Sequence, residues 1–214
     1  MFKDRKDAGV HLVALLEHAP IIAQTPTDDL LVLSIPRGGV VVGAVVAQTM
    51  GCKHDVVIVK KIGFPTNEEM AVGAMAEDGW TAIDRQTLHY YGLAQEALKP
   101  SLAQTRAKIE YYKTLFRHGK ALNVTGKIVI VVDDGVATGE TMKAAVHWVQ
   151  NQGCEKVVVA VPVAAPSTAR ELGMLADAFV CLFVPDDFVA VGQFYEHFEQ
   201  VEDEEVLKLL GRVG

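Results

Sequence analysis

The chain has 214 residues, half of them hydrophobic, and a formal net charge of -7 at pH 7. This length and composition are enough to bury a large core, so we predict one domain spanning residues 1–214. A nucleic-acid backbone needs a broad basic face, so the net negative charge argues against nucleic acid as a partner.

Cysteine usage and hydropathy indicate the compartment. Cys52, Cys154 and Cys181 lie far apart without metal-ligand spacing, which predicts buried free thiols in a reducing environment and no zinc site. No apolar run approaches the length of a membrane span, and the N-terminus carries charges of both signs. We therefore expect a soluble, cytoplasmic protein without a membrane partner.

The first predicted element is a helix at residues 4–17. Val10, Val13 and Leu16 fall on one helical face, with Ala14 beside them. We expect this helix only to cover the core.

A strand at residues 30–35 and a helix at residues 40–50 flank the sequence PRGG at 36–39. The free N–H groups at the start of a helix bind anions, so this turn is a candidate anion cradle. Arg37 could bind two phosphate oxygens at once through its planar guanidinium group. A solvated arginine at a strand end is the alternative interpretation.

A strand at residues 55–60 ends in Lys60 and Lys61, two cations that stand out in an acidic protein. Side chains alternate between the two faces of a strand, so we expect only one of the two lysines to reach a site. The sequence does not indicate which one. Residues 62–83 are rich in glycine and polar residues. They are typical of a mobile lid that excludes water or of a plain surface hairpin.

Two helices are predicted between this segment and the middle of the chain. Asp84 is a suitable N-cap for a short helix that ends at Tyr91. Residues 93–117 are helical in composition, with a break or restart at Pro100. We expect this longer helix to flank the sheet.

Residues 128–142 are the most informative stretch of the sequence and read IVIVVDDGVATGETM. Five apolar residues predict a strand buried on both faces, which ends at Asp133 and Asp134 facing solvent. Small and hydroxyl-bearing residues follow, and a helix opens after them, an arrangement that binds phosphate. Because ligands gather at the carboxyl ends of strands in open α/β sheets, we predict one site for phosphate with hydroxyls or a metal ion.

Alternating strands and helices continue after this motif. We predict strands at residues 156–161 and 178–183, a helix at 167–175 capped by Ser167, and a short exposed helix at 202–210. This order favours an α/β fold, with a mostly parallel central sheet flanked by helices on both faces.

The motif at 128–142 lacks the lysine of nucleoside-triphosphate loops. It resembles the phosphoribosyl-pyrophosphate (PRPP) signature of type I phosphoribosyltransferases: an apolar strand, two acidic residues, then Ala-Thr-Gly-x-Thr. The resemblance implies a core at about 25–183, a flexible hairpin loop at about 62–83 and a small C-terminal hood at about 184–200. An ordinary strand-to-helix turn with a threonine cap is the alternative.

The resemblance also implies roles for individual residues. The PRPP-binding residues would be Arg37, Gly38, Gly39, Lys60, Lys61, Asp133, Asp134, Ala137, Thr138, Gly139, Glu140 and Thr141. Catalytic roles would fall to Asp133, Asp134, Arg37 and Lys61. Mg²⁺ is the implied cofactor, with Asp133, Asp134 and Glu196 as its candidate ligands.

The stretch VPDDFVAVGQFYEHF at 184–198 resembles the hood of the hypoxanthine-guanine branch of this family. By that resemblance, Phe188 would stack on the base, and Glu196 falls where the branch has a metal-binding aspartate. Two positions depart from the branch, which has an aspartate in place of Ala137 and a base-reading lysine in place of Ala176. An aromatic tail packed as core is the alternative.

The implied reaction transfers the 5-phosphoribosyl group of PRPP to a nitrogen acceptor, a nucleobase or other small nitrogen heterocycle, and releases pyrophosphate. A non-catalytic regulator that binds PRPP or a nucleotide on the same fold is the alternative. A hydrolase is disfavoured because the Gly-x-Ser-x-Gly elbow is absent from the sequence. We count a homodimer among the candidate assemblies.

Overall fold

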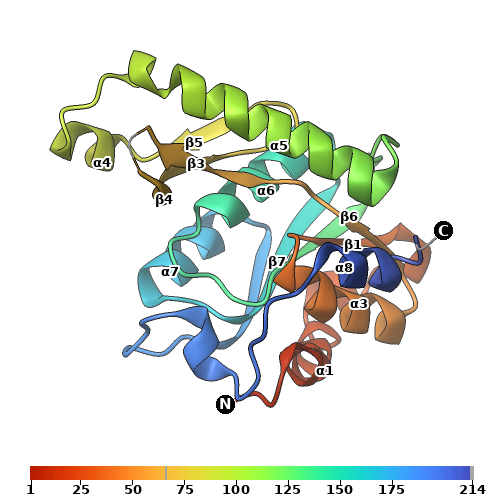
Figure 1. The fold of residues 1–214 in the computed structure, drawn as a ribbon. Helices are drawn as coiled ribbons and strands as arrows, with labels where there is room; N and C mark the ends of the chain where they lie inside the picture. The colour runs from red at the N-terminus through yellow and green to blue at the C-terminus, as the bar shows by residue number, and fades with distance from the viewer. Residues whose placement is uncertain (66, 213–214) are drawn as a thin grey trace.

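The computed structural model describes residues 1–65 and 67–212. Thr66, which belongs to the predicted loop at 62–83, and residues 213–214 therefore lie outside the described residues. The described chain forms a parallel sheet flanked by helices and a smaller antiparallel sheet covered by a long helix (Figure 1).

The parallel sheet confirms the predicted α/β fold class. Its strand order is β2-β1-β6-β7-β8, and every neighbouring pair is parallel. The strands are β1 (Leu30–Ser34), β2 (Lys53–Val56), β6 (Ile128–Val132), β7 (Lys156–Val163) and β8 (Ala178–Phe183).

Both faces of this sheet are covered, which explains its continuous apolar strands. Along β6, Ile128 and Ile130 pack into the cluster formed with α1 (Arg5–Leu16) and α3 (Gly38–Met50). Val129 and Val131 point to the opposite face, which is covered by α6 (Glu140–Asn151) and α7 (Pro166–Leu175). All five residues of β6 are buried, as the apolar run predicts.

Short elements connect these layers. They are α2 (Pro20–Ala23), α4 (Arg85–Tyr90), α8 (Asp203–Leu209) and the 3-10 helices η1 (Thr27–Asp29), η2 (Gln95–Leu98) and η3 (Val191–Phe194). Asp84 caps α4 by accepting hydrogen bonds from two backbone N–H groups, as predicted. The predicted Ser167 cap is wrong: α7 begins one residue earlier, at Pro166, whose fixed φ suits the first turn of a helix.

The predicted strand at 55–60 divides into two strands of different sheets. β2 ends at Val56, residues 57–59 cross between the sheets, and Lys60 begins β3 (Lys60–Phe64). β3 pairs with β4 (Asn67–Met75), which pairs with β5 (Thr81–Ile83), all antiparallel. Lys60 and Lys61 therefore do not end a parallel strand.

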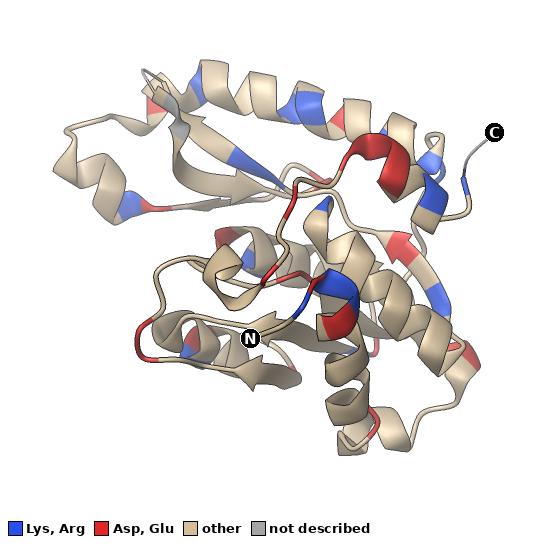
Figure 2. Ribbon diagram, turned by 60° about the horizontal axis from the view of Figure 1, so that its bottom comes forward, with Lys and Arg blue, Asp and Glu red and all other residues tan. Residues whose placement is uncertain are grey.

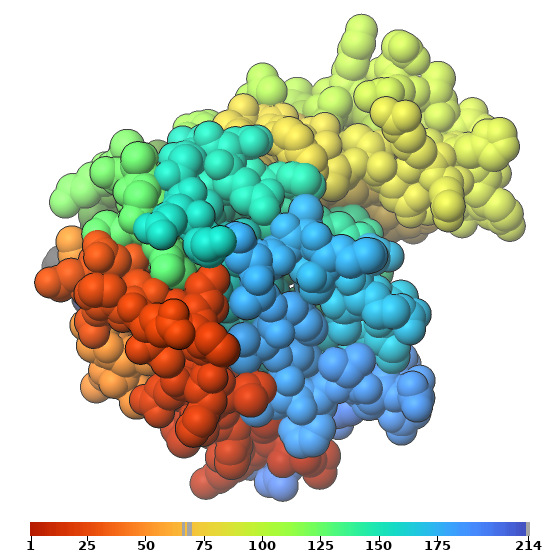
Figure 3. All heavy atoms as spheres, turned by 180° about the vertical axis from the view of Figure 1, so that it is seen from behind, coloured from red at the N-terminus to blue at the C-terminus, as the bar shows by residue number. Residues whose placement is uncertain are grey.

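The second sheet packs between the long helix and the main part of the molecule. Helix α5 (Lys99–Arg117) lies along it, and Ile109 and Phe116 of the helix pack with Ile62, Val72 and Met75 of the sheet. Seen from the back, this part of the molecule projects beyond the rest (Figure 3). The described residues of the segment at 62–83 thus form a packed antiparallel sheet, and movement of this segment as a lid stays a prediction.

Three smaller expectations need correction. Val10 is exposed, because the buried face of α1 is formed by Leu12, Val13 and Leu16 with Ala8 and Gly9. The helix predicted as exposed at 202–210 buries Val206 completely, since α8 packs beside α3. The three cysteines are free thiols, as expected, but are half-buried.

No helix within residues 1–65 and 67–212 is both long enough and apolar enough to cross a lipid bilayer.

A buried ion pair ties the long helix and the second sheet to the segment that crosses between the sheets. Arg117, at the end of α5, donates a hydrogen bond to Glu77, which follows β4, and both side chains are at least 95% buried. The other Glu77 oxygen accepts a hydrogen bond from the Ile58 backbone N–H at 2.7 Å. Burial raises the pKa of Glu77, and Arg117 opposes that rise. Because Ile58 lies in the crossing segment, the pair connects α5 and the end of β4 with that segment.

We expect Arg117→Met to lower the free energy of unfolding by about 3–5 kcal/mol, because it leaves the Glu77 charge buried without a partner. Urea denaturation measures this loss. The double variant Arg117→Met, Glu77→Gln should recover part of it. Lys113→Met is the matched control, since its ion pair with Glu110 on the same helix is partly exposed and should contribute less than about 1 kcal/mol. Equal losses in the two single variants would contradict this role for the buried pair.

Candidate active site at the carboxyl ends of the strands

A cavity of about 510 Å³ opens where β1 and β6 end. Its lining residues come from five segments of the chain: Ile35, Pro36, Val59, Lys60, Lys61, Lys108, Asp133, Gly135, Val136, Ala137, Thr138, Gly139, Thr141 and Val191. The structure therefore brings together the predicted lysines, one of the predicted aspartates and most of the predicted phosphate loop. Arg37, Gly38, Gly39, Asp134 and Glu140 are neighbours in sequence of these lining residues but do not line the cavity.

The phosphate loop at 137–141 is held in place by α7 and β7. Thr168 donates a hydrogen bond from its hydroxyl to the Ala137 carbonyl at 2.6 Å, and the Val136 N–H donates to the Val163 carbonyl at 2.9 Å. Gly139 has a positive φ of 85° at the start of α6, and a Cβ there would lie 2.7 Å from Thr168. Glycine is therefore required at this close contact. The loop leads into the start of α6, as the sequence predicts, and its binding of phosphate stays a prediction.

The turn at 36–39 lies directly against the two aspartates. A Cβ on Gly39 would lie 2.9 Å from Asp133 Cα, and one on Gly38 would overlap the Asp134 carboxylate. The Pro36–Arg37 peptide bond is cis. Only glycines allow this close approach, which accounts for the Gly-Gly pair.

The two aspartates differ in environment. Asp133 lines the cavity, whereas Asp134 Oδ2 accepts a hydrogen bond from Arg5 Nε at 2.7 Å and only 14% of its side chain is exposed. The expectation that both face solvent is therefore wrong for Asp134. Burial raises the pKa of Asp133 well above its usual range, and the adjacent Asp134 carboxylate adds to this. Burial also raises the pKa of Asp134, and Arg5 opposes that rise.

Arg5 is a site residue that sequence reasoning missed. It begins α1, and the prediction that this helix only covers the core is wrong. Its contact with Asp134 joins residues 129 positions apart, and no local pattern in the sequence points to it.

The N-terminus also holds the hood. Phe2 N–H donates to the Phe194 carbonyl at 2.7 Å, and Glu196 N–H donates to the Phe2 carbonyl at 2.8 Å. The Tyr195 hydroxyl donates to the Asp134 carbonyl at 2.6 Å. The N-terminus, the hood and the acidic pair are thus one connected unit.

Both predicted lysines reach the cavity, so the expectation that only one would do so is wrong. They lie where the chain turns from the crossing segment into β3, and not within the parallel sheet. Lys108 of α5 joins them and was not foreseen. Lys60 Nζ lies 3.6 Å from the centre of the Tyr112 ring, and burial, with the positive charge of Arg37, lowers the pKa of Lys60 to about 8.

Arg37 lies beside the cavity and contacts the acidic start of α8. Its Nη1 lies 3.6 Å from Asp203 and 3.9 Å from Glu202. Figure 2 shows the acidic start of α8 as a continuous red segment. The predicted phosphate-binding arginine is therefore paired with carboxylates in this structure.

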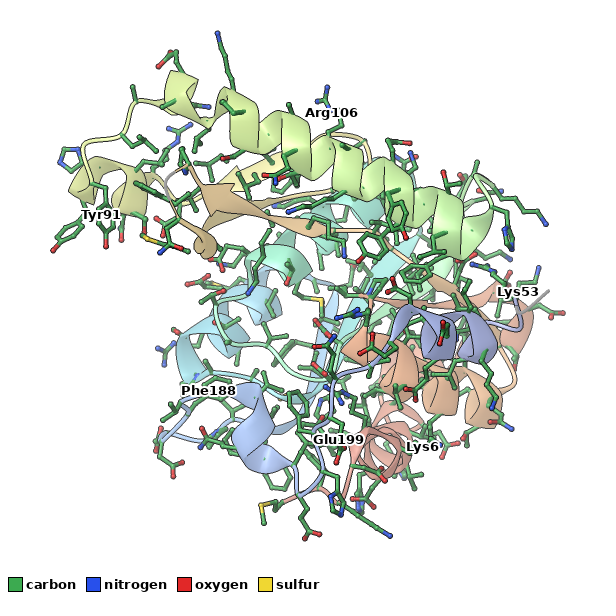
Figure 4. The ribbon with its side chains drawn as sticks, in the orientation of Figure 1. Lys6, Lys53, Tyr91, Arg106, Phe188 and Glu199 are labelled. Carbon is green, nitrogen blue, oxygen red and sulfur yellow. The ribbon has the colours of Figure 1, made fainter. Side chains whose placement is uncertain are left out.

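Two predicted residues lie in the hood, outside the cavity lining. Phe188, labelled in Figure 4, stacks on Phe194 with 5.6 Å between ring centres. Glu196 is exposed. The hood residue that does line the cavity is Val191, which packs against Gly135. The base-stacking role of Phe188 and the metal-binding role of Glu196 stay predictions.

Comparison with known proteins bears directly on this site. The sequence model of the phosphoribosyl transferase domain family matches residues 17–199. Two curated Mycobacterium tuberculosis proteins, from strains CDC 1551 and H37Rv, are provisionally described as phosphoribosyl transferases. Each is 37% identical over 213 residues, which cover 99% of this chain and 47% of theirs. The chain thus spans about half the length of these curated relatives.

Solved structures agree with the fold. The crystal structure of TT1426 from Thermus thermophilus is 40% identical, with a TM-score of 0.76 over 98% of this chain and 97% of that one. A hypothetical protein from Neisseria gonorrhoeae, crystallised with bound ppGpp, is 14% identical with a TM-score of 0.51 over 99% of this chain and 95% of its own, which supports the fold alone. With the matched domain covering most of its length, the chain belongs to the phosphoribosyl transferase family.

Proposed function

We propose that the protein transfers the 5-phosphoribosyl group of PRPP to a nitrogen acceptor, a nucleobase or related heterocycle, and releases pyrophosphate. The observation that carries this proposal is one cavity in which a phosphate cradle, Asp133 and three lysines meet. PRPP has anionic groups at both ends and a ribose between them. Its binding site therefore needs anion-binding groups at two places and a hydrogen-bond acceptor for the ribose hydroxyls between them. Membership of the family supports a transferase.

Each part of the cavity has a task in this reaction. The loop at 137–141 would hold the 5-phosphate through backbone N–H groups and hydroxyls. Asp133 would accept hydrogen bonds from the ribose hydroxyls. Lys60, Lys61 and Lys108 would stabilise the charge that develops on the leaving pyrophosphate. Holding donor and acceptor in line would remove most of the entropic cost of their encounter.

Arg37 would have to change partners to take part. In this structure it faces Glu202 and Asp203, which compete with pyrophosphate oxygens for the same guanidinium group. An arginine binds pyrophosphate well because its planar fork can contact two oxygens at once.

Asp133 suits a Mg²⁺ ion that arrives with PRPP. Mg²⁺ is usually bound by one or two carboxylates together with substrate oxygens and water, and Asp133 faces the cavity as such a carboxylate. Among the side chains that the structure describes, no group of three or more His, Cys, Asp or Glu could hold a metal ion. Bound Mg²⁺ would neutralise negative charge on the leaving pyrophosphate.

PRPP should bind with Mg²⁺ and bind at least about tenfold more weakly in EDTA, because its charge must be neutralised within an acidic protein. Titration calorimetry measures both affinities. Ribose 5-phosphate, which lacks the pyrophosphate, is the matched ligand control and should depend less on Mg²⁺. An absence of heat with and without Mg²⁺ would remove the central claim, whereas binding without pyrophosphate release for any acceptor would favour the non-catalytic regulator.

The affinity for PRPP should fall as pH rises through about 8, because the Lys60 amine is charged below its pKa and neutral above it. The expected loss is about tenfold between about pH 7 and about pH 9, where PRPP keeps its own charge since the last phosphate pKa is about 6. Lys60→Arg stays charged and should flatten this profile. Lys61→Arg keeps Lys60 and should retain the wild-type profile. A steep profile in Lys60→Arg would show that another group titrates.

Hypoxanthine and guanine should be poor acceptors. Ala137 lines the cavity without a carboxylate, and Ala176 lies in the core-packed region at the end of α7, outside the lining. Each polar group left unpaired costs about 1–3 kcal/mol, enough to lower turnover by one or two orders of magnitude. A panel of nitrogen heterocycles, assayed by pyrophosphate release, tests this. Efficient turnover of hypoxanthine or guanine would mean that other groups read the base.

A further inference from the structure

Arg5 is fixed by three groups from two distant parts of the chain. Its Nε donates to Asp134 Oδ2 at 2.7 Å, and its Nη1 donates to the Glu199 carbonyl at 2.8 Å. Its guanidinium carbon lies 3.8 Å from the centre of the Phe198 ring. Glu199 lies next to α1 in Figure 4, and only 11% of the Arg5 side chain is exposed. This guanidinium therefore has a defined position beside the acidic pair.

These contacts make the two aspartates unequal. The Asp134 carboxylate is turned toward α1, into space that Gly38 leaves open. Its backbone is fixed as well, because its N–H donates to Asp133 Oδ1 at 2.8 Å and its carbonyl accepts from the Tyr195 hydroxyl. Asp133 alone of the pair lines the cavity.

We infer that Arg5 is a positioning residue that neutralises Asp134 and leaves Asp133 as the carboxylate that meets the ribose of PRPP. This inference rests on the proposed function. Without Arg5, a second negative charge would lie unpaired, largely buried and next to the site for a polyanion. A carboxylate and a bound polyanion that lie next to each other repel strongly where water is partly excluded. Loss of Arg5 should therefore weaken PRPP binding even if the fold is intact.

A merely structural role, in which Arg5 fastens the N-terminus to the hood, predicts a different result. It would lower thermal stability but would not make PRPP affinity depend on the charge at position 134. The dissociation constant of PRPP with Mg²⁺ and the melting temperature should therefore be measured together for each variant. Lys6→Gln is the matched control, because Lys6 is the next residue of α1, carries the same charge and is exposed.

Arg5→Gln should weaken PRPP binding by about tenfold, because it leaves the Asp134 charge unpaired beside the site for a polyanion. Arg5→Lys keeps the charge and should restore most of that loss, and Lys6→Gln should bind as the wild type does. Asp133→Asn should weaken binding several-fold more than Asp134→Asn. When Asp134→Asn is already present, adding Arg5→Gln should cost less than it does in the wild type, because the charge it neutralises is gone.

The outcomes separate this inference from the proposed function. If wild-type protein binds PRPP but Arg5→Gln binds as well as Lys6→Gln does, the inference is overturned and the proposed function stands. The inference is also overturned if Arg5→Gln costs as much with Asp134→Asn as without it, or if it lowers only the melting temperature. If wild-type protein does not bind PRPP, the proposed function fails and this inference fails with it.

Discussion

Two adjacent carboxylates at the end of β6, beside a cavity suited to anions, impose a constraint on the surrounding structure. Like charges at this distance repel, and burial adds the cost of removing each from water. This unfavourable energy is offset differently for the two aspartates. Asp134 is paired with Arg5, and Asp133 accepts a backbone N–H and faces the cavity.

Other features near the site follow from this arrangement. Gly38 and Gly39 are needed because any side chain there would collide with one of the two aspartates. Tyr195 holds the Asp134 carbonyl, and the hood that carries Tyr195 is in turn bound to the first residues of the chain. The first residues of the chain therefore support the acidic pair, both directly through Arg5 and through the hood.

Local sequence patterns predicted the parallel sheet and the glycine-containing turn at 137–141 because both depend on short-range chemistry. A run such as residues 128–132 must be buried on both faces, and Gly139 is required by a backbone conformation within its own loop. The parts that could not be predicted depend on long-range contacts. Arg5 reaches Asp134 across 129 positions, and Lys108 enters the cavity only because α5 lies along the second sheet. Periodicity also could not reveal that the apolar run before Lys60 changes sheets after Val56.

The cavity is lined by residues from both sheets, and this determines how its charges are held. Asp133 and the phosphate loop belong to the parallel sheet, whereas Lys61 and Lys108 belong to the second sheet and α5. The position of Lys61 and Lys108 relative to Asp133 therefore depends in part on residues 57–59, which cross between the sheets, and on Glu77, which binds both Ile58 and Arg117. A shift of about 1 Å between reacting groups can cost two orders of magnitude in rate. A buried ion pair is in general weak evidence for stability. The Glu77–Arg117 pair has a geometric reason to be present, because it helps to fix the lysines of the cavity relative to Asp133.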